Sequence, residues 1–281
     1  VHELPVADFT VQPVCDGFPA SFQNLSTIAF PENIVTWQWD YGDGSPPEVA
    51  VNANHIYPGE GDWDASILVV SGHGCRDSIT QTVTIYPVPV PDFAVDTAAG
   101  CQPLCINFSD LSTITSGSIV TWNWILGDLT LSNAQNPANC YYNDDNFTST
   151  LVSVSLEIFS NFGCKADTVF NDVIEVYPIP QADFTFSPLS TSLLNPQVNF
   201  TDYSINPVAW HWDFGEPTLD TDTSAEQNPI YDFETFGNMY ASLIVWNRYG
   251  CSDTTTHTVA IDPDFVTVSY THLTLPTNRE V

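Results

Sequence analysis

Closely spaced aspartates are the first residues in this sequence whose types could do chemistry. Carboxylate oxygens in loops are the ligands that Ca²⁺ prefers in proteins. The candidate calcium ligands are Asp40, Asp43, Asp144, Asp145, Asp220 and Asp222. Their spacing matches neither an EF-hand loop nor a glycine-rich calcium repeat. The alternative is that these carboxylates cap turns and solvate the surface. A calcium titration followed by thermal melting would distinguish the two.

The seven cysteines form a second set of reactive side chains. So many cysteines in a polar chain are typical of proteins that fold in an oxidising compartment. The sequence has no Cys-x-x-Cys pair and no histidine at the spacing of a zinc ligand. We therefore expect disulfides rather than a metal centre.

No catalytic constellation is visible in the sequence. It contains neither Gly-x-Ser-x-Gly nor His-Glu-x-x-His, the patterns of two common hydrolase types. His55 stands in a His-x-Tyr motif, where we expect it to pack or to form local hydrogen bonds. The sequence predicts a protein that is not an enzyme and has no cofactor, calcium excepted.

The net charge is extreme. The chain has 34 acidic against 4 basic residues, a formal charge of −30 in 281 residues. Such a surface repels phosphate and anionic lipid, which excludes nucleic acid and acidic membranes as expected partners. No apolar run is long enough to be a transmembrane segment. Together with the cysteines, this charge favours an extracellular or cell-surface location.

A tryptophan motif recurs through the chain. Its first copy is Trp37-Gln38-Trp39-Asp40-Tyr41-Gly42-Asp43-Gly44, and the second tryptophan of each copy is Trp39, Trp124 or Trp212. These tryptophans are 85 and 88 residues apart, a period that corresponds to one whole domain per repeat. Because the tryptophans persist while the acidic and glycine positions change, we interpret the motif as a core strand followed by a variable turn.

Apolar residues alternate with polar ones around this motif, as in half-buried strands. Val35, Trp37, Trp39 and Tyr41 lie two apart and are expected on one face, and Phe18, Ala20 and Phe22 show the same pattern. Each repeat has about seven such short segments with turn signals between them, which predicts a two-sheet antiparallel sandwich without helices.

The linkers Tyr86-Pro87-Val88-Pro89 and Tyr177-Pro178-Ile179-Pro180 carry alternating prolines. Such segments are extended and stiff. We therefore expect a rod-like array of repeats.

The motifs resemble those of PKD (polycystic kidney disease) domains. The resemblance rests on Ala-Asp-Phe-Thr, Phe-x-Asn-x-Ser, Trp-x-Trp-Asp-Tyr-Gly-Asp-Gly, Asn-x-x-His-x-Tyr and a final Gly-Cys turn, and it covers all three repeats. It implies three tandem immunoglobulin-like β-sandwiches, a surface location and no catalytic residues. The Gly-Cys turns and Pro-x-Pro linkers are similar to arrays in large secreted proteins of gliding bacteria, which end in a domain exported by type IX secretion.

Two copies depart from the family pattern. Ile125 and Leu129 replace the first aspartate and the last glycine in the second copy, and Glu216 and Pro217 follow the glycine in the third. These departures put any acidic function of the motif in doubt.

The predicted organisation follows from the repeats. Residues 1–5 are read as the end of an upstream repeat, 6–88 as domain 1, 89–179 as domain 2, 180–263 as domain 3, and 264–267 as the start of a truncated C-terminal domain. Residues 268–281 break the pattern and resemble a translated sequencing adapter, with a genuine final strand as the alternative.

The cysteine pairing has two solutions. Cys15 and Cys101 precede the second strand, whereas Cys75, Cys164 and Cys251 stand in the turn before the last strand. One scheme joins Cys15–Cys75 and Cys101–Cys164 within repeats. In an immunoglobulin-like sandwich these two positions lie at opposite ends, and disulfide Cα atoms must approach within about 7 Å. The other scheme therefore joins Cys15–Cys164 and Cys101–Cys251 across junctions.

Cys105 and Cys140 are extra to the second repeat and are expected to form a bridge across neighbouring strands on the outer face. The basic residues Arg76, Lys165 and Arg248 each lie beside a Gly-Cys turn. There they could pair with the acidic neighbouring repeat across a junction.

Three functions remain open at this point. The chain is a non-catalytic spacer or interaction array in a bacterial surface protein with an adhesin-like role, a module that binds polysaccharide or glycoprotein, or an accessory segment of a secreted hydrolase. The expected partners are neighbouring repeats and a protein or polysaccharide at the cell surface. A glycan array separates the first two functions, and the full reading frame separates the third from both.

Overall fold

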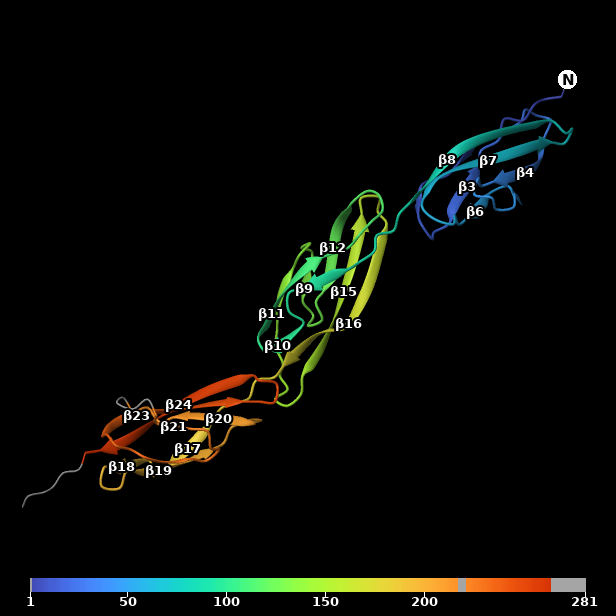
Figure 1. Cartoon of the computed structure of the whole chain (residues 1–281). Helices are drawn as coiled ribbons and strands as arrows, with labels where there is room; N and C mark the ends of the chain where they lie inside the picture. The colour runs from blue at the N-terminus through green and yellow to red at the C-terminus, as the bar shows by residue number, and fades with distance from the viewer. Residues whose placement is uncertain (1, 217–220, 264–281) are drawn as a thin grey trace, which may run out of the picture. The chain divides into compact units, whose positions relative to one another are not determined.

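The computed structural model describes residues 2–216 and 221–263. These residues form β-strands, turns and loops without a helix, and they build three immunoglobulin-like sandwiches (Figure 1). The predicted all-β fold class is therefore confirmed. Within the described residues no helix is long and apolar enough to span a bilayer. Asp220, Pro217 and the segments 264–267 and 268–281 lie outside the described residues.

Repeat 1 contains eight strands. They are β1 (Phe9–Thr10), β2 (Val14–Cys15), β3 (Ala20–Asn24), β4 (Ile34–Asp40), β5 (Glu48–Val49), β6 (Ala53–His55), β7 (Gly61–Ser71) and β8 (Arg76–Tyr86). One sheet has the order β1-β3-β6 and the other β2-β8-β7-β4-β5. In Figure 1 the long hairpin strands β7 and β8 lie side by side, with β3 and β6 in the opposite layer.

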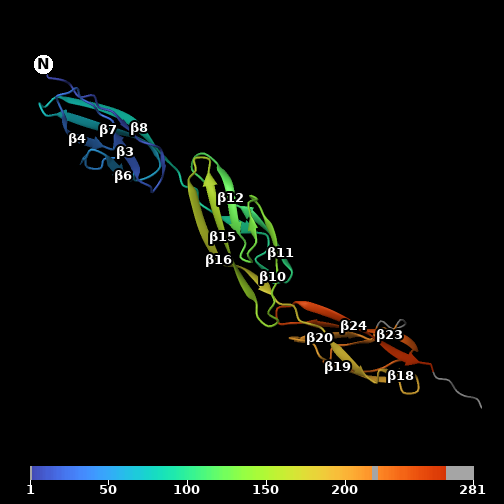
Figure 2. The same ribbon diagram turned by 180° about the vertical axis from the view of Figure 1, so that it is seen from behind.

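Repeats 2 and 3 have the same plan. Repeat 2 contains β9 (Phe93–Val95), β10 (Ala99–Cys101), β11 (Leu104–Asp110), β12 (Ile119–Ile125), β13 (Leu131–Ser132), β14 (Ala138–Tyr141), β15 (Thr150–Ser160) and β16 (Lys165–Tyr177). Repeat 3 contains β17 (Phe184–Ser187), β18 (Ser190–Ser192), β19 (Gln197–Asp202), β20 (Ala209–Asp213), β21 (Thr223–Ser224), β22 (Ile230–Asp232), β23 (Gly237–Trp246) and β24 (Ser252–Asp262). Their sheets are β14-β11-β9 with β10-β16-β15-β12-β13, and β17-β19-β22 with β18-β24-β23-β20-β21. Figure 2 shows the paired strands β15 and β16 from behind.

By their contacts the residues also divide into two compact units. The first contains residues 1–98, 105–140 and 151–174, and the second contains the rest. Each contact described below lies within one of these units.

Each sandwich is antiparallel except for one edge pair. The short strands β2, β10 and β18 pair in parallel with β8, β16 and β24. This register sets Cys15 directly beside Tyr86, and Cys101 directly beside Tyr177. The sequence did not indicate this parallel pair, because strands of two or three residues carry no measurable alternation.

The second tryptophan of each motif is buried in its sandwich. Trp39, Trp124 and Trp212 are at most 1% exposed, and each indole Nε1–H donates to a backbone carbonyl, at Ala50, Ala134 and Glu226 respectively. A buried indole needs such an acceptor. Aromatic rings surround these side chains, as where Phe9 meets Trp39 edge-on at 5.3 Å.

Two expectations about strand faces were wrong. Val35 is 50% exposed although the alternation predicted it on the face of Trp37. A register shift between Ile34 and Thr36 explains this difference, because a bulge adds one residue to the strand and turns it outward. Phe18 is 61% exposed because it lies in the turn before β3 and outside the alternating strand.

The turn before the last strand has one conformation in all three repeats. The amide of its first residue donates to the carbonyl of the cysteine in Ser71–Cys75, Ser160–Cys164 and Asn247–Cys251. The glycine before each cysteine has φ of 82°, 83° or 84°, a left-handed conformation that glycine adopts without steric cost. The Gly-Cys pair is therefore required by a fixed backbone geometry.

Candidate functional site

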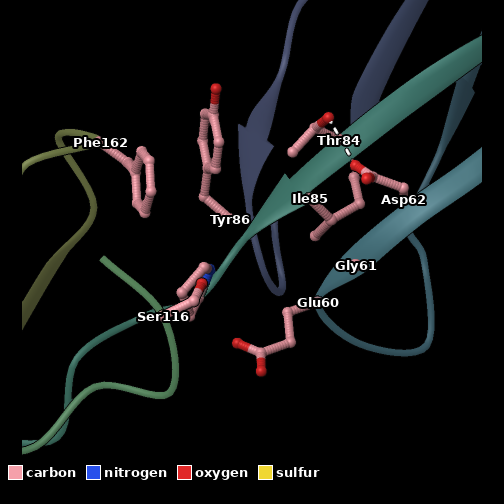
Figure 3. A pocket seen from close by; sticks show the side chains of 9 residues that line it. Glu60, Gly61, Asp62, Thr84, Ile85, Tyr86, Ser116 and Phe162 are labelled. Atoms are coloured by element: carbon pink, nitrogen blue, oxygen red, sulfur yellow. Dashed lines mark hydrogen bonds between the residues drawn. The ribbon is translucent and has the colours of Figure 1, made fainter.

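Two contacts between repeats 1 and 2 start from a pair of neighbouring residues, Cys15 and Tyr86. Cys15 forms a disulfide with Cys164, with their Cα atoms 5.6 Å apart. The adjacent Tyr86 stacks on Phe162, with ring centroids 4.3 Å apart and ring planes inclined by 3°. Figure 3 shows these two rings facing each other. Because Phe162 and Cys164 are two residues apart in one turn, the parallel pair of β2 and β8 meets that turn at two points.

The same two contacts recur between repeats 2 and 3. Cys101 is bonded to Cys251, with Cα atoms again 5.6 Å apart. Tyr177 stacks on Tyr249 at 4.9 Å between centroids and an interplanar angle of 14°. We call the disulfide and the ring stack together the junction contacts.

The structure thus contains the pairs of the cross-junction scheme and neither pair of the within-repeat scheme. The parallel edge strand carries its cysteine at one end of a sandwich, beside the start of the linker. The Gly-Cys turn lies at the other end of β8, which is eleven residues long. Cys75 has no disulfide among the described residues.

The third disulfide lies within repeat 2. Cys105 in β11 and Cys140 in β14 are joined with a Cα separation of 3.9 Å, and both residues are exposed. β11 and β14 are neighbours in their sheet. This bridge is therefore a cross-strand link on the outer face and involves no junction.

A hollow of about 300 Å³ lies beside the first junction (Figure 3). Tyr86, Phe162, Glu60 and Ser116 are among its lining residues. The Glu60 carboxylate accepts a hydrogen bond of 2.6 Å from the Thr115 hydroxyl. This polar contact adds a third link between repeats 1 and 2.

The basic residues near the turns behave differently from one another. Arg248 donates to the Phe147 carbonyl at 3.1 Å and to the Tyr249 hydroxyl at 2.6 Å, so it contacts repeat 2 across the junction. Lys165 instead pairs with Glu157 at 2.5 Å in its own repeat. The expected pairing across the junction is therefore wrong for Lys165. Its strand β16 lies next to β15, where Glu157 provides an acceptor within the same repeat.

In every repeat, the acidic residue after the motif's glycine contacts a side chain at the same position of the opposite sheet. Asp43 contacts His55 Nε2 at 2.6 Å, Asp128 accepts from Asn139 at 2.8 Å, and Glu216 accepts from Tyr231 at 2.9 Å. The three partners occupy equivalent positions in β6, β14 and β22. The turn does vary, as the sequence indicated, but its carboxylate persists as a link between the two sheets.

Asp43 is the most strongly perturbed of these carboxyl groups. Its side chain is 5% exposed, and it accepts hydrogen bonds from the Ser45 amide and hydroxyl as well as contacting His55. Burial alone would raise the pKa of Asp43, but the hydrogen bonds from Ser45 and His55 outweigh it and lower the pKa to about 2. His55 also stacks on Tyr41 at 3.9 Å, which fixes its ring.

Glu216 performs the same task in repeat 3 with more donors. It is 3% exposed and accepts from the amides of Glu234 and Thr235, each at 2.8 Å. Four donors in all satisfy its two oxygens, since the hydroxyls of Tyr231 and Thr235 also donate. A buried carboxylate is tolerated only when it is satisfied in this way.

The candidate calcium ligands that the structure describes lie in or beside turns at three separate places, with Asp40 at the end of β4. Asp40 accepts from the Gly42 amide, Asp145 from the amides of Phe147 and Thr148, and Asp222 from the Glu216 amide. Asp144 is exposed. These bonds fit the alternative that aspartates cap turns, and calcium binding stays a prediction for the titration.

One cluster escaped the sequence reasoning. His2, Glu32 and His73 bring their ligand atoms within 4.8 Å of one another. Their separations in sequence match no metal motif, and only the fold brings the first residues to the turn that contains His73. The sole available signal was the alignment of His2 with Tyr86, which placed it at the start of a linker.

The comparisons with known proteins agree with this fold. The model of the PKD domain family matches residues 2–87. The PKD1 domain of Vibrio anguillarum Epp is 25% identical over 30% of this chain and 96% of its own, with a TM-score of 0.28. The PKD1 domain of the Vibrio cholerae metalloprotease PrtV is 27% identical over 29% of this chain and 96% of its own, with a TM-score of 0.26.

Over nearly the full length, a three-domain titin segment, I67–I69, has a similar fold. It covers 94% of this chain and 100% of its own at 12% identity, with a TM-score of 0.50. A search of curated proteins finds no match. The chain therefore consists of tandem PKD-like or immunoglobulin-like domains, and the comparisons identify no catalytic domain.

Proposed function

We propose that this chain is a non-catalytic extracellular array whose repeats are held in a defined relation by the junction contacts. The observation that carries the proposal is the recurrence of the same disulfide and ring stack at both junctions. A chain that only needed to connect independent domains would require neither contact. Proline-rich linkers of a few residues limit freedom further.

Composition supports a location outside the cell. Three disulfides need an oxidising compartment. A charge of −30 favours solubility and discourages binding to anionic partners. The Gly-Cys turns and Pro-x-Pro linkers, which resemble those of gliding bacteria, support an adhesin-like surface protein exported by type IX secretion.

We also propose the domain boundaries 6–88, 89–179 and 180–263. Isolated bridges mark the start of each repeat, where Val6 pairs with Thr27, Val90 with Thr113 and Gln181 with Ile205. Each bridge follows a proline-containing stretch in the sequence. These bridges support linkers that lie just before the first strand of each sandwich.

Small-angle X-ray scattering of disulfide variants tests the function. Replacing Cys15 and Cys164 together by Ser, and likewise Cys101 and Cys251, should widen the distribution of molecular dimensions. The matched control replaces Cys105 and Cys140, which removes a disulfide but no junction contact, and should leave that distribution unchanged. If the unmodified protein shows a distribution as wide as the junction variants, the proposal is wrong.

A glycan array provides a second test of the proposed function. A spacer should bind no sugar above background, with the junction variants giving the same result. Specific binding to one polysaccharide class would instead favour the alternative of a carbohydrate-binding module. A hydrolase domain found in the complete reading frame would favour an accessory role.

A further inference from the structure

Three potential metal ligands from separate segments meet beside the Gly-Cys turn of repeat 1. His2 Nδ1 lies 3.1 Å from Glu32 Oε1, and His73 Nδ1 lies 3.5 Å from Glu32 Oε2. The two imidazole rings stack with centroids 3.9 Å apart and planes inclined by 16°. Both ring nitrogens therefore face the same carboxylate from one side.

Glu32 is the buried member of this cluster. Its side chain is only 11% exposed, and its Oε2 is buried without a hydrogen-bond partner among the described residues. A desolvated carboxylate oxygen without a donor destabilises a fold unless a cation approaches it. The negative charge on Glu32 Oε2 is thus only partly compensated, and a bound cation would compensate it.

The spacing of the ligand atoms fits a tetrahedral ion. Atoms bound at about 2.0–2.1 Å to tetrahedral zinc lie about 3.3–3.4 Å from one another. His2 Nδ1 lies 3.1 Å from Oε1 and His73 Nδ1 lies 3.5 Å from Oε2 of the same carboxylate, distances close to that value. One ligand atom from each of the three residues lies within 4.8 Å of the other two. Two imidazoles and one carboxylate are also the donor set of many zinc sites with one open position.

The same positions in repeat 2 hold no ligands. His2 corresponds to Tyr86 at the start of a linker, and His73 to Phe162 in the turn. Glu32 corresponds to Gly117. The Gly72 amide donates to the carbonyl of Asn33, which follows Glu32, and the equivalent Asn161 amide donates to the carbonyl of Ser118, which follows Gly117. The ring stack is present at both places. At the start of repeat 1, however, the two stacked rings are imidazoles, and a carboxylate takes the position of the glycine.

From this geometry we propose that His2, Glu32 and His73 form a binding site for a divalent transition metal, with Zn²⁺ as the best match. The ion links the segment around His2 to the Gly-Cys turn of repeat 1. It reinforces the stack of His2 on His73, just as a disulfide lies beside the corresponding ring stack at the two following junctions. Hard cations do not compete for it, because they prefer oxygen ligands.

Isothermal titration calorimetry with ZnCl₂ tests the site. The protein is the disulfide-intact chain with Cys75→Ser, which removes the free thiol as a competing ligand. Calcium and magnesium chloride in excess occupy the acidic surface. We expect one Zn²⁺ per chain and a rise in the melting temperature of repeat 1.

The variants His73→Phe and His2→Tyr introduce the residues found in repeat 2, so they keep the ring stack. Each should weaken Zn²⁺ binding at least about tenfold, as should Glu32→Gln. His211→Ala removes an exposed histidine of repeat 3 and should leave binding unchanged. The proposal is overturned if the parent chain binds no Zn²⁺, or if its binding survives both His73→Phe and Glu32→Gln.

Discussion

Repeats 1 and 2 share one turn geometry but use it for different chemistry. The hydrogen bonds and glycine conformation of Ser71–Cys75 match those of Ser160–Cys164. In repeat 2 the turn carries a phenylalanine that stacks and a cysteine that is bonded. In repeat 1 it carries His73 and the free Cys75. The backbone fixes where the side chains lie, and single residues decide what they do there.

A second difference lies at the first tryptophan of the motif. Trp122 Nε1 donates to Asp110 at 2.7 Å, and Trp210 Nε1 donates to Asp202 at 2.8 Å. In repeat 1 the residue at the position of these aspartates is Asn24. Trp37 Nε1 is buried without a hydrogen-bond partner among the described residues. The single side-chain oxygen of Asn24 accepts from the Ser26 amide, so its NH₂ group takes the position of the second carboxylate oxygen and cannot accept from Trp37.

The largest expected effect tests what the repeats have in common. Trp39→Ala and Trp124→Ala each remove an indole that is buried to the same extent. Each should lower the free energy of unfolding of its own repeat by about 3–5 kcal/mol. Calorimetry of thermal unfolding, or a urea titration, measures the loss of unfolding free energy. Very unequal losses would show that the two cores are not equivalent.

The next effect separates the two turns. Cys164→Ser removes a junction disulfide and should destabilise the chain by about 2–4 kcal/mol. Cys75→Ser, its matched control, removes a thiol without a disulfide and should change stability little. Melting curves under non-reducing conditions measure both. A similar loss in the two variants would contradict the comparison.

The carboxylate between the sheets should make repeat 1 sensitive to acid. The pKa of Asp43 is about 2 in the folded chain against an ordinary value of 3.8. Because the folded pKa is lowered, this contribution to stability is present above about pH 4 and is lost as the pH falls toward 2. Asp43→Asn should cost about 1–3 kcal/mol at neutral pH.

Melting temperatures measured between pH 2 and pH 7 check this behaviour. The difference between the parent chain and Asp43→Asn should shrink as the pH falls below about 4. A difference that stays constant over the whole range would exclude Asp43 as the titrating group.

The smallest effect repairs the tryptophan of repeat 1. Asn24→Asp supplies the acceptor that repeats 2 and 3 already have and should stabilise the chain by about 0.5–1.5 kcal/mol. The reverse change, Asp110→Asn, should destabilise repeat 2, because Trp122 and Gln135 both donate to that carboxylate. Differential scanning calorimetry compares the two. The same sign for both changes would refute the explanation.

Much of the fold could be predicted from local patterns. The alternation that placed Phe22, Trp39 and Tyr41 in a core is a property of neighbouring residues, because successive side chains of a strand point to opposite faces. The bulge that exposes Val35 could not be predicted, since it depends on the register with β7. The parallel pairing of β2 with β8 was missed because a strand of two residues shows no alternation.

By itself, the sequence determined the number of repeats, the sandwich class, the tryptophan cores and the positions of the turns. These features repeat at a fixed period and depend on contacts within short segments. Only the tertiary structure decided which cysteines pair, why the acid after the motif's glycine persists, and that His2 lies on His73. Those contacts join residues far apart in the chain, and their geometry is set by how the sheets and turns pack rather than by any local spacing.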